Sequence, residues 1–222
     1  MSKKSDGAQI PFKRKDEKLA LVTKHRLALA EVLDGLSEAE WNTPTLCDGW
    51  EVRHVVGHLL TPALSPSWRT AAAVARRGSY RGAFDHLARQ FGEKPPTELH
   101  SLLVEHANNV WSPPTMGPAA PLTDAIVHGQ DIVRPLGLEL EVEPLEVDPS
   151  LTFVVGPKSN QLFVPPKRYA NIRLIATDLK WRVGKGPEVE GPALELLMAL
   201  MGRGIALQHL SGPGFDTLSE RI

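Results

Sequence analysis

The sequence predicts a mostly helical protein that ends in a smaller unit of mixed α and β structure. Three observations carry this prediction. Apolar residues recur at helical spacing through most of the first 140 residues. Two short segments around residue 178 alternate apolar with polar residues, as the strands of a hairpin do. Prolines mark several boundaries between segments. A helical bundle followed by an α+β unit accounts for this order.

The first two predicted helices flank a turn-rich connection. The segment 16–36 repeats Leu and Val at steps of three and four residues. After the connection, Asp48 is a good N-cap, and Glu51 completes a pattern that resembles a capping box. Pro62 is expected to end the second helix. Its buried stripe is expected to consist of Val52, Val55, Val56 and Leu59.

The remaining elements follow from the same two periodicities. In the first part of the chain, we expect helices at 68–77 and 80–91, a helix that begins at Thr97, a proline-rich loop at 112–121, and a helix that carries Asp124 and His128 and ends at Gly137. Further on, we expect an irregular acidic stretch at 139–149, a helix at 151–162, a hairpin at 172–177 and 179–183, a third strand at 188–190, a helix at 193–201, and a last helix or turn at 205–210. The predicted organisation is a loose basic tail at 1–15, a helical bundle at 16–140, and the small unit at 141–222, either separate or packed with the bundle as one core.

Composition excludes several classes of partner. The 222 residues are 42% hydrophobic and carry a net charge of -1, so no overall field attracts nucleic acid or anionic lipid. No run approaches the ~20 apolar residues that a membrane-spanning helix needs, and the N-terminus lacks the apolar segment of a signal peptide. The single cysteine, Cys47, fits a reducing compartment. We therefore expect a cytoplasmic protein with a small-molecule substrate.

Three side chains outline a metal site. His58 lies at the margin of the second helix's apolar stripe, and Asp124 and His128 are four residues apart on a later helix, so they share one face. Two helices can thus bring three ligands to one point. Three protein ligands leave coordination positions open, which is typical of a catalytic metal site rather than a structural one.

Other interpretations of these residues stay open from the sequence alone. A single histidine at a helix margin is commonly packed or solvated, and Asp124 suits the positive end of a helix dipole. The pair His54 and His58 and the core-facing His106 are rival choices of ligand.

Two strings of the sequence add a family resemblance. The segments WNTPTLCDGWEVRHVVGHL at 41–59 and LTDAIVHGQDIVRPLG at 122–137 resemble the mycothiol-dependent maleylpyruvate isomerase family, a branch of the DinB-like, YfiT-like metalloprotein superfamily. Further along the chain, Ala176-Thr177-Asp178, Trp181, Gly191-Pro192 and Gly202-Arg203 are similar to the small α/β unit that follows the bundle in such proteins.

The resemblance implies a DinB-like four-helix bundle that holds one divalent metal. The metal is usually zinc, and His58, Asp124 and His128 stand at its ligand positions. The characterised isomerases have Glu where this chain has Asp124, so the carboxylate here is one methylene shorter. That difference leaves the preferred metal and the reaction open.

The resemblance also implies mycothiol as a thiol cosubstrate. A thiol bound to a divalent metal is present as thiolate, which could isomerise a double bond, open an epoxide or displace a leaving group. The chain would then be an isomerase or transferase that acts on a small electrophilic substrate. A metal-dependent hydrolase and a non-catalytic metal-binding or small-ligand-binding protein are the alternatives, and an apolar face of the bundle would suit a homodimer.

Three further residues have two interpretations each. Asp131 could orient a ligand imidazole, or it could pair with Arg134 or Arg53 as a surface acid. Arg203 could clamp a substrate carboxylate, or it could simply lie near a helix C-terminus. Cys47 is expected to pack, with redox sensitivity as its other role.

Two large aromatic residues flank the loop that holds the cysteine. Trp41 and Trp50 are expected to wedge this loop against the bundle.

Overall fold

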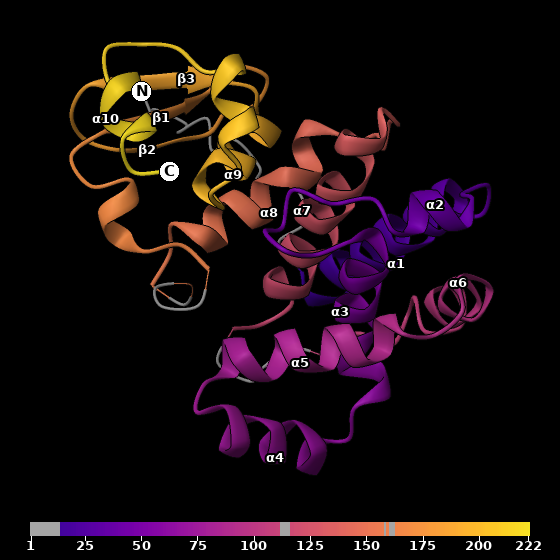
Figure 1. Cartoon of the computed structure of the whole chain (residues 1–222). Helices are drawn as coiled ribbons and strands as arrows, with labels where there is room; N and C mark the ends of the chain where they lie inside the picture. Colours follow the sequence, from indigo (N-terminus) through magenta and orange to yellow (C-terminus); the bar gives the residue numbers. More distant parts are fainter. Residues whose placement is uncertain (1–13, 112–115, 158, 160–162) are drawn as a thin grey trace. The chain divides into compact units, whose positions relative to one another are not determined.

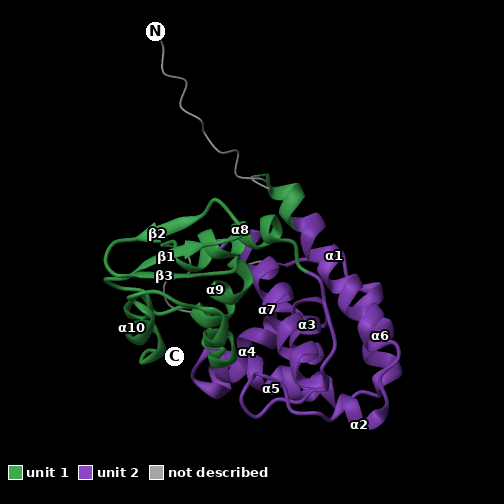
Figure 2. Ribbon diagram, turned by 90° about the horizontal axis from the view of Figure 1, so that it is seen from above, with its two compact units in different colours: residues 1–18, 142–222 green, residues 19–141 purple. Residues whose placement is uncertain are grey.

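The computed structural model describes residues 14–111, 116–157, 159 and 163–222, so most of the predicted tail at 1–15 lies outside the described residues. Leu19–Glu141 forms one compact unit, and Val142–Ile222 together with the start of the first helix, up to Lys18, forms the other (Figure 2). The first unit is helical, and the second adds a three-stranded sheet. The predicted fold class, mainly α with a small α+β unit, is confirmed.

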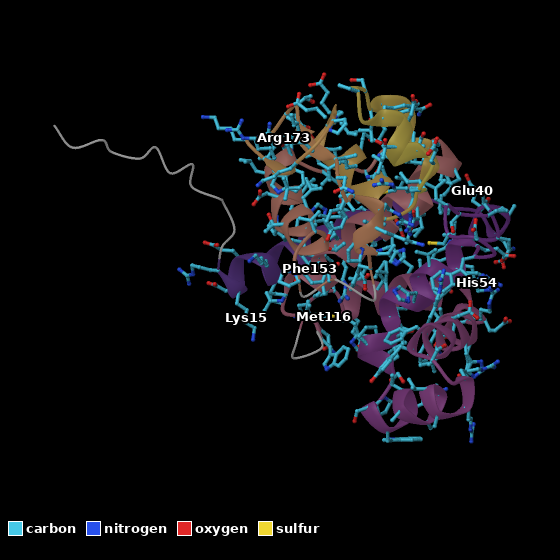
Figure 3. All side chains as sticks on the ribbon, turned by 90° about the vertical axis from the view of Figure 1, so that its left-hand side faces the viewer. Lys15, Glu40, His54, Met116, Phe153 and Arg173 are labelled. Carbon is cyan, nitrogen blue, oxygen red and sulfur yellow. The ribbon has the colours of Figure 1, made fainter. Side chains whose placement is uncertain are left out.

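The helical unit is built around its third helix (Figure 1). Helix α3 packs most extensively on α5, also contacts α6 and α7, and α4 covers α5. Side chains fill the space between these helices (Figure 3). The helices are α1 (Lys15–Leu33), α2 (Glu38–Trp41), α3 (Val52–Leu64), α4 (Ser67–Arg77), α5 (Tyr80–Gly92), α6 (Pro96–Glu105) and α7 (Ala119–Leu136).

One apolar core joins five of these helices, α1, α2, α3, α6 and α7, and the segment after α7. The stripe predicted for the second helix is confirmed, because Val52, Val55, Val56 and Leu59 are all buried. The core consists of Leu29, Ala30 and Leu33 from α1, Trp41, then Val52, Val55, Val56, Leu59 and Leu60 from α3, Leu99 and Leu103 from α6, Ile132 and Val133 from α7, and Leu140.

Helix α3 begins later than predicted. Its N-cap is Glu51 rather than Asp48, and the backbone N–H of Glu51 donates to Nδ1 of His54 at 3.1 Å. His54, labelled in Figure 3, is buried, although its place nearly opposite the apolar stripe of this helix predicts exposure to solvent. The connection runs on past Asp48 because Thr45 and Trp50 pair through their backbones, at 2.9 Å from N–H to carbonyl.

Several other boundaries differ from the predictions. Helix α3 continues through Pro62 to Leu64, because the proline removes only one backbone hydrogen bond and α3 packs extensively on α5. Helix α7 begins at Ala119, inside the stretch predicted as loop. Helix α1 ends at Leu33, and the short α2 was not predicted.

The C-terminal unit begins with a helix where an irregular stretch was predicted. Helix α8 (Pro144–Val154) opens with proline at its first position, which suits a helix start, and it packs on α9 (Ala193–Leu200). The predicted helix at 151–162 is thus only the end of α8, and residues 158 and 160–162 lie outside the described residues. The short elements of this unit are η1 (Pro166–Arg168), η2 (Gly204–His209) and α10 (Phe215–Ser219).

The sheet of this unit has the order β2-β1-β3. The predicted hairpin is confirmed: β1 (Arg173–Ala176) and β2 (Arg182–Gly184) are antiparallel, with Leu174 opposite Val183. The third strand, β3 (Glu188–Gly191), pairs parallel to β1 on its other edge. Among the described helices, none is long and apolar enough to cross a membrane.

Candidate metal centre

Helices α3 and α7 bring His58, Asp124 and His128 together. Nε2 of His58 lies 3.8 Å from Oδ2 of Asp124, and one potential ligand atom from each of the three residues lies within 4.8 Å of the others. The two α7 residues are one turn apart, so both project from the same side of that helix. The predicted convergence of the three side chains is therefore present in the helical unit.

The three side chains are mostly buried but not sealed. The exposed fractions are 15% for His58, 12% for His128 and 33% for Asp124, so the carboxylate marks the more accessible side. Burial lowers the pKa of His58. Burial would raise the pKa of Asp124, but the nearby imidazoles and Arg26 outweigh it and lower this pKa. A neutral imidazole and an ionised carboxylate are the forms that bind a cation.

A buried carboxylate holds the ring of His128. Asp131 is 0% exposed, and its Oδ2 lies 2.9 Å from Nδ1 of His128. With Nδ1 engaged, Nε2 is the nitrogen left for the centre, an arrangement common for metal-ligating histidines. The contact that the orienting interpretation of Asp131 requires is present, and the burial of Asp131 does not fit an acid on the surface.

The thiol of Cys47 joins this contact. Its Sγ donates to the same oxygen of Asp131 at 3.0 Å and lies 3.6 Å from Nδ1 of His128. The backbone N–H of Leu46 also donates to the carbonyl of Asp131, at 3.2 Å. The loop before α3 is thus bonded to α7, and Cys47, which packs on the core as expected, also contacts His128 and Asp131.

Cys47, His128 and Asp131 form a second group of potential ligands. This group shares His128 with the first but uses its other nitrogen. A cation held there would have to displace the hydrogen bond between His128 and Asp131, whereas a cation held by His58, Asp124 and His128 leaves that bond intact. The first group therefore fits a metal with less rearrangement, and its donor set of two imidazoles and one carboxylate suits zinc.

Aromatic rings cover the two histidines. The ring of Trp50 lies 5.3 Å from that of His58 and 6.4 Å from that of His128, between centroids. Phe84 contacts His58 edge-on at 5.8 Å. The indole N–H of Trp50 donates to the carboxylate of Asp85 at 2.8 Å, and this bond holds the Trp50 ring beside the two histidines. Trp50 thus borders the centre, whereas Trp41 is part of the apolar core.

The other candidate residues have hydrogen bonds or caps of their own. His54 uses Nδ1 to cap α3, and His106 is the half-buried C-cap of α6. Arg203 belongs to the C-terminal unit, where its Nη1 donates to the carbonyl of Met201 at 2.6 Å.

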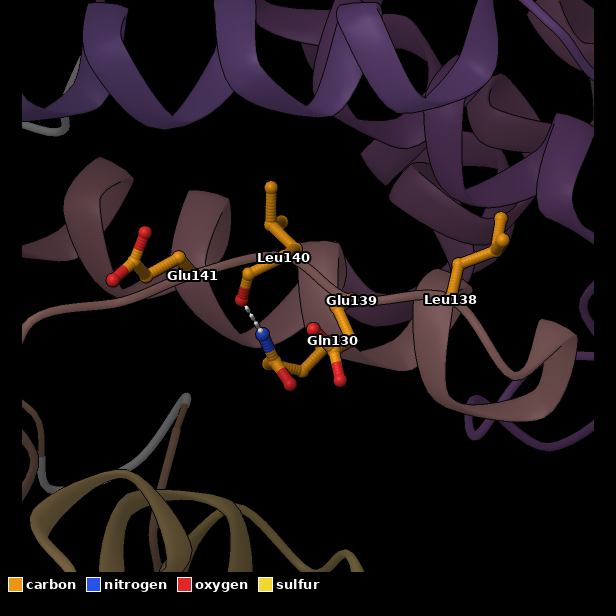
Figure 4. Close-up of a pocket in the computed structure, with 5 residues that line it drawn as sticks. All are labelled: Gln130, Leu138, Glu139, Leu140 and Glu141. Carbon is orange, nitrogen blue, oxygen red and sulfur yellow. Dashed lines mark hydrogen bonds between the residues drawn. The ribbon is translucent and has the colours of Figure 1, made fainter.

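A surface pocket near the end of α7 does not contain the candidate ligands (Figure 4). It has a volume of about 490 Å³ and is lined by Gln130, Leu138, Glu139, Leu140 and Glu141. Inside it, the side-chain amide of Gln130 donates to the carbonyl of Leu140 at 2.9 Å. Its lining residues include two glutamates but no histidine or cysteine.

Replacing Asp131 with asparagine is expected to weaken metal binding about 10- to 100-fold, because the group that orients His128 loses its charge. The Zn²⁺ dissociation constant, measured in competition with a chelator, checks this. Asp34→Asn is the matched control, since the Asp34 side chain is 78% exposed. Equal affinities for Asp131→Asn and the unsubstituted protein would show that Asp131 does not support the site.

Metal binding is expected to release a proton from His128. Burial lowers the pKa of this imidazole, but the charges and hydrogen bonds of Cys47 and Asp131 outweigh burial and raise the pKa to about 10. Below that pH a cation must displace the proton, so the apparent affinity should fall about tenfold per pH unit as the pH decreases. Calorimetry in buffers of different ionisation enthalpy measures the release, and a heat independent of the buffer would contradict it.

The same pKa shift has a defined sign for stability. In the folded protein the pKa of His128 is above the ordinary value of 6.5. The stabilisation that protonated His128 gives to the metal-free fold is therefore fully present below about pH 6.5, and it is lost as the pH rises toward 10.

Comparison with known proteins first defines the fold. The chain is similar to the crystal structure titled as the mycothiol-dependent maleylpyruvate isomerase, with a TM-score of 0.62 and 14% identity over 90% of this chain and 93% of that one. A structure of a variant of that isomerase, with one histidine replaced by alanine, matches equally well. At this identity the match establishes the fold.

The sequence comparison is more specific. Residues 22–110 match the family described as the mycothiol maleylpyruvate isomerase N-terminal domain. The predicted resemblance is therefore confirmed, and this segment is a domain of that family. It contains Cys47 and His58, whereas Asp124 and His128 follow it. Among curated protein sequences, no match is found.

Proposed function

We propose that the chain is a cytoplasmic, metal- and thiol-dependent isomerase or transferase that acts on a small electrophilic substrate. Mycothiol is the proposed thiol, and zinc is the proposed metal. The observation that carries the proposal is the convergence of His58, Asp124 and His128, with Nδ1 of His128 held by Asp131. The domain match at 22–110 and the fold shared with a mycothiol-dependent maleylpyruvate isomerase support it.

The residues of the chain would hold and orient the cation. His58 and Asp124 supply two ligand atoms, and His128 supplies Nε2 because Asp131 occupies Nδ1. Trp50 covers both imidazoles and limits access of water to them. Asp124, the most exposed of the three ligands, lies on the side from which a further ligand can approach.

A bound divalent cation lowers the pKa of a coordinated thiol, so the thiol is present as thiolate. A thiolate that adds to a cis double bond conjugated to a carbonyl would form a C–S bond and move the electron pair of the double bond to the carbonyl oxygen, leaving a single bond about which the substrate can rotate. The thiolate then leaves as the trans double bond forms, and it is regenerated. In a transferase reaction the thiolate instead displaces a leaving group and stays in the product. Neither route requires a nucleophile from the protein.

The direct test is thiol binding to the cobalt-substituted protein. Mycothiol is titrated into the Cys47→Ser variant, in which any sulfur that reaches the cobalt comes from the added thiol. We expect a saturable thiolate-to-cobalt charge-transfer band. His58→Ala should lose the band because it lacks one ligand, and His86→Ala should keep it because His86 is exposed on α5.

Turnover of maleylpyruvate, with and without mycothiol, separates the proposal from its alternatives. Isomerisation that requires the thiol supports the proposal. Hydrolysis of a substrate without any thiol would instead favour a metal-dependent hydrolase. A thiol-binding protein that turns over neither maleylpyruvate nor a panel of epoxides and halides would favour a binding role.

A further inference from the structure

A buried arginine on α1 faces the interior of the helical unit. Arg26 is 4% exposed, and Leu29 and Leu33, one and two turns further along the same face, are part of the core. That core also contains Val55 and Leu59, which flank His58 on α3. The side chain of Arg26 is therefore buried on the face of α1 that packs on this core.

The hydrogen bonds of Arg26 are incomplete. Its Nη1 donates to the backbone carbonyls of Asn109 at 3.2 Å and His106 at 3.5 Å. Its Nε is buried without a hydrogen-bond partner, and no carboxylate among the described residues forms an ion pair with it. Arginine is seldom this buried unless it is paired, because an unpaired charge is costly to remove from water.

The charge of Arg26 acts on the candidate metal centre. It contributes to lowering the pKa values of both Asp124 and His58, after the effects of burial and of their closer neighbours. In return, Asp124 partly offsets the lowering of the pKa of Arg26 that burial causes. The charge of Arg26 therefore acts on Asp124 and His58 through space, although no hydrogen bond or ion pair among the described residues joins Arg26 to them.

The charges near the centre then leave a positive excess. With a divalent cation in place, both imidazoles neutral and Cys47 in the thiol form that donates to Asp131, the carboxylates of Asp124 and Asp131 balance the cation. The charge of Arg26 is left over. In a mostly buried site, such a charge attracts anions more strongly than it would in water.

From the buried Nε that has no hydrogen-bond partner and the charge that Arg26 brings to Asp124 and His58, we propose that Arg26 makes the site selective for ligands that carry an anionic group, such as a carboxylate. This inference rests on the proposed function, since it concerns ligands that bind at the same cation. It assigns Arg26 a role in substrate choice in addition to its bonds to the end of α6.

Two thiols that differ in one charge test the inference. Mercaptoacetate carries a carboxylate, and 2-mercaptoethanol is neutral. Their dissociation constants are measured on the cobalt-substituted protein at low ionic strength, where screening is weak. We expect mercaptoacetate to bind about tenfold more tightly. Arg26→Gln should remove most of this preference, and Arg26→Lys should keep part of it.

Arg76→Gln is the matched control, because Arg76 is exposed on α4 and its loss removes the same charge from the same unit. It should leave the preference unchanged. An equal preference in Arg26→Gln and the unsubstituted protein would overturn the inference. If Arg26→Gln does not fold, the unsubstituted protein still decides, since equal or tighter binding of 2-mercaptoethanol overturns the inference as well.

Acetate separates a failure of this inference from a failure of the proposed function. If neither thiol binds the cobalt protein but acetate changes its absorption spectrum, the thiol-dependent function is wrong. Arg26 is then judged on acetate alone: loss of acetate binding in Arg26→Gln supports the inference, and retained binding overturns it. If no anion binds, both fail.

Discussion

His58→Ala is expected to reduce the metal content of the purified protein from about one ion per chain to about a tenth or less. The variant removes one of three protein ligands, and a site of two ligands holds zinc weakly. It should otherwise disturb little, since Nδ1 of His58 has no hydrogen-bond partner among the described residues and its ring is held by Trp50 and Phe84. Elemental analysis measures the content.

His128→Ala should lose the metal to the same extent but with a larger effect on folding. It leaves the buried carboxylate of Asp131 without its imidazole partner, which costs about 1–3 kcal/mol. His86→Ala serves as the control for both variants, because His86 is exposed. If both His58→Ala and His128→Ala keep about one equivalent of metal, neither histidine is a ligand.

The second large effect is expected from Gly57→Ala, which should destabilise the helical unit by about 3 kcal/mol or more. A Cβ at Gly57 would lie 2.3 Å from the carbonyl oxygen of Ala88 and 2.8 Å from the backbone nitrogen of Gly92. Both atoms belong to α5, so they cannot move without separating two helices. Because His58 follows directly, metal binding should weaken too. Urea unfolding of the metal-free protein gives the free-energy change.

Gly35→Ala provides the matched control for this substitution. A Cβ there meets nothing within 4 Å, and the residue lies in the short connection after α1. Its free energy of unfolding should change by less than about 1 kcal/mol. A similar loss in the two variants would show that the close approach of α3 and α5 does not limit the residue at position 57.

The helical spacing of the candidate ligands could be predicted because it is local. The four-residue step from Asp124 to His128 fixes their common face wherever the helix lies. The place of His58 at the margin of an apolar stripe directs it toward neighbouring helices. The spacing of residues within one helix does not show which helices are neighbours. The expectation that these two helices lie side by side came from the family resemblance.

Some errors arose from signals that compete. Asp48 and Glu51 are both acceptable helix starts, and the backbone pairing of the connection, which depends on residues further away, selects Glu51. Pro62 reads as a helix end, but packing of α3 on α5 keeps the helix intact beyond it. The acidic stretch before residue 149 has little helical periodicity, yet Pro144 occupies the tolerated first position of α8, and the helix continues through Pro149.

The roles of Cys47 and Arg26 could not be predicted from spacing. The contact between Cys47 and Asp131 joins residues 84 positions apart and depends on the path of one loop. Arg26 lies on a helix among charged neighbours, so its sequence context suggests solvent rather than the interior. Both residues become informative only when packing shows which polar groups are buried near the candidate ligands.

X-ray absorption at the zinc edge of the metal-loaded protein, without added thiol, tests the central claim most directly. We expect only nitrogen and oxygen neighbours at about 2.0 to 2.2 Å, from two imidazoles, one carboxylate and solvent. Addition of mycothiol should then introduce one sulfur at about 2.3 Å. A sulfur neighbour before any thiol is added would place Cys47 on the metal and would contradict the assignment of His58, Asp124 and His128.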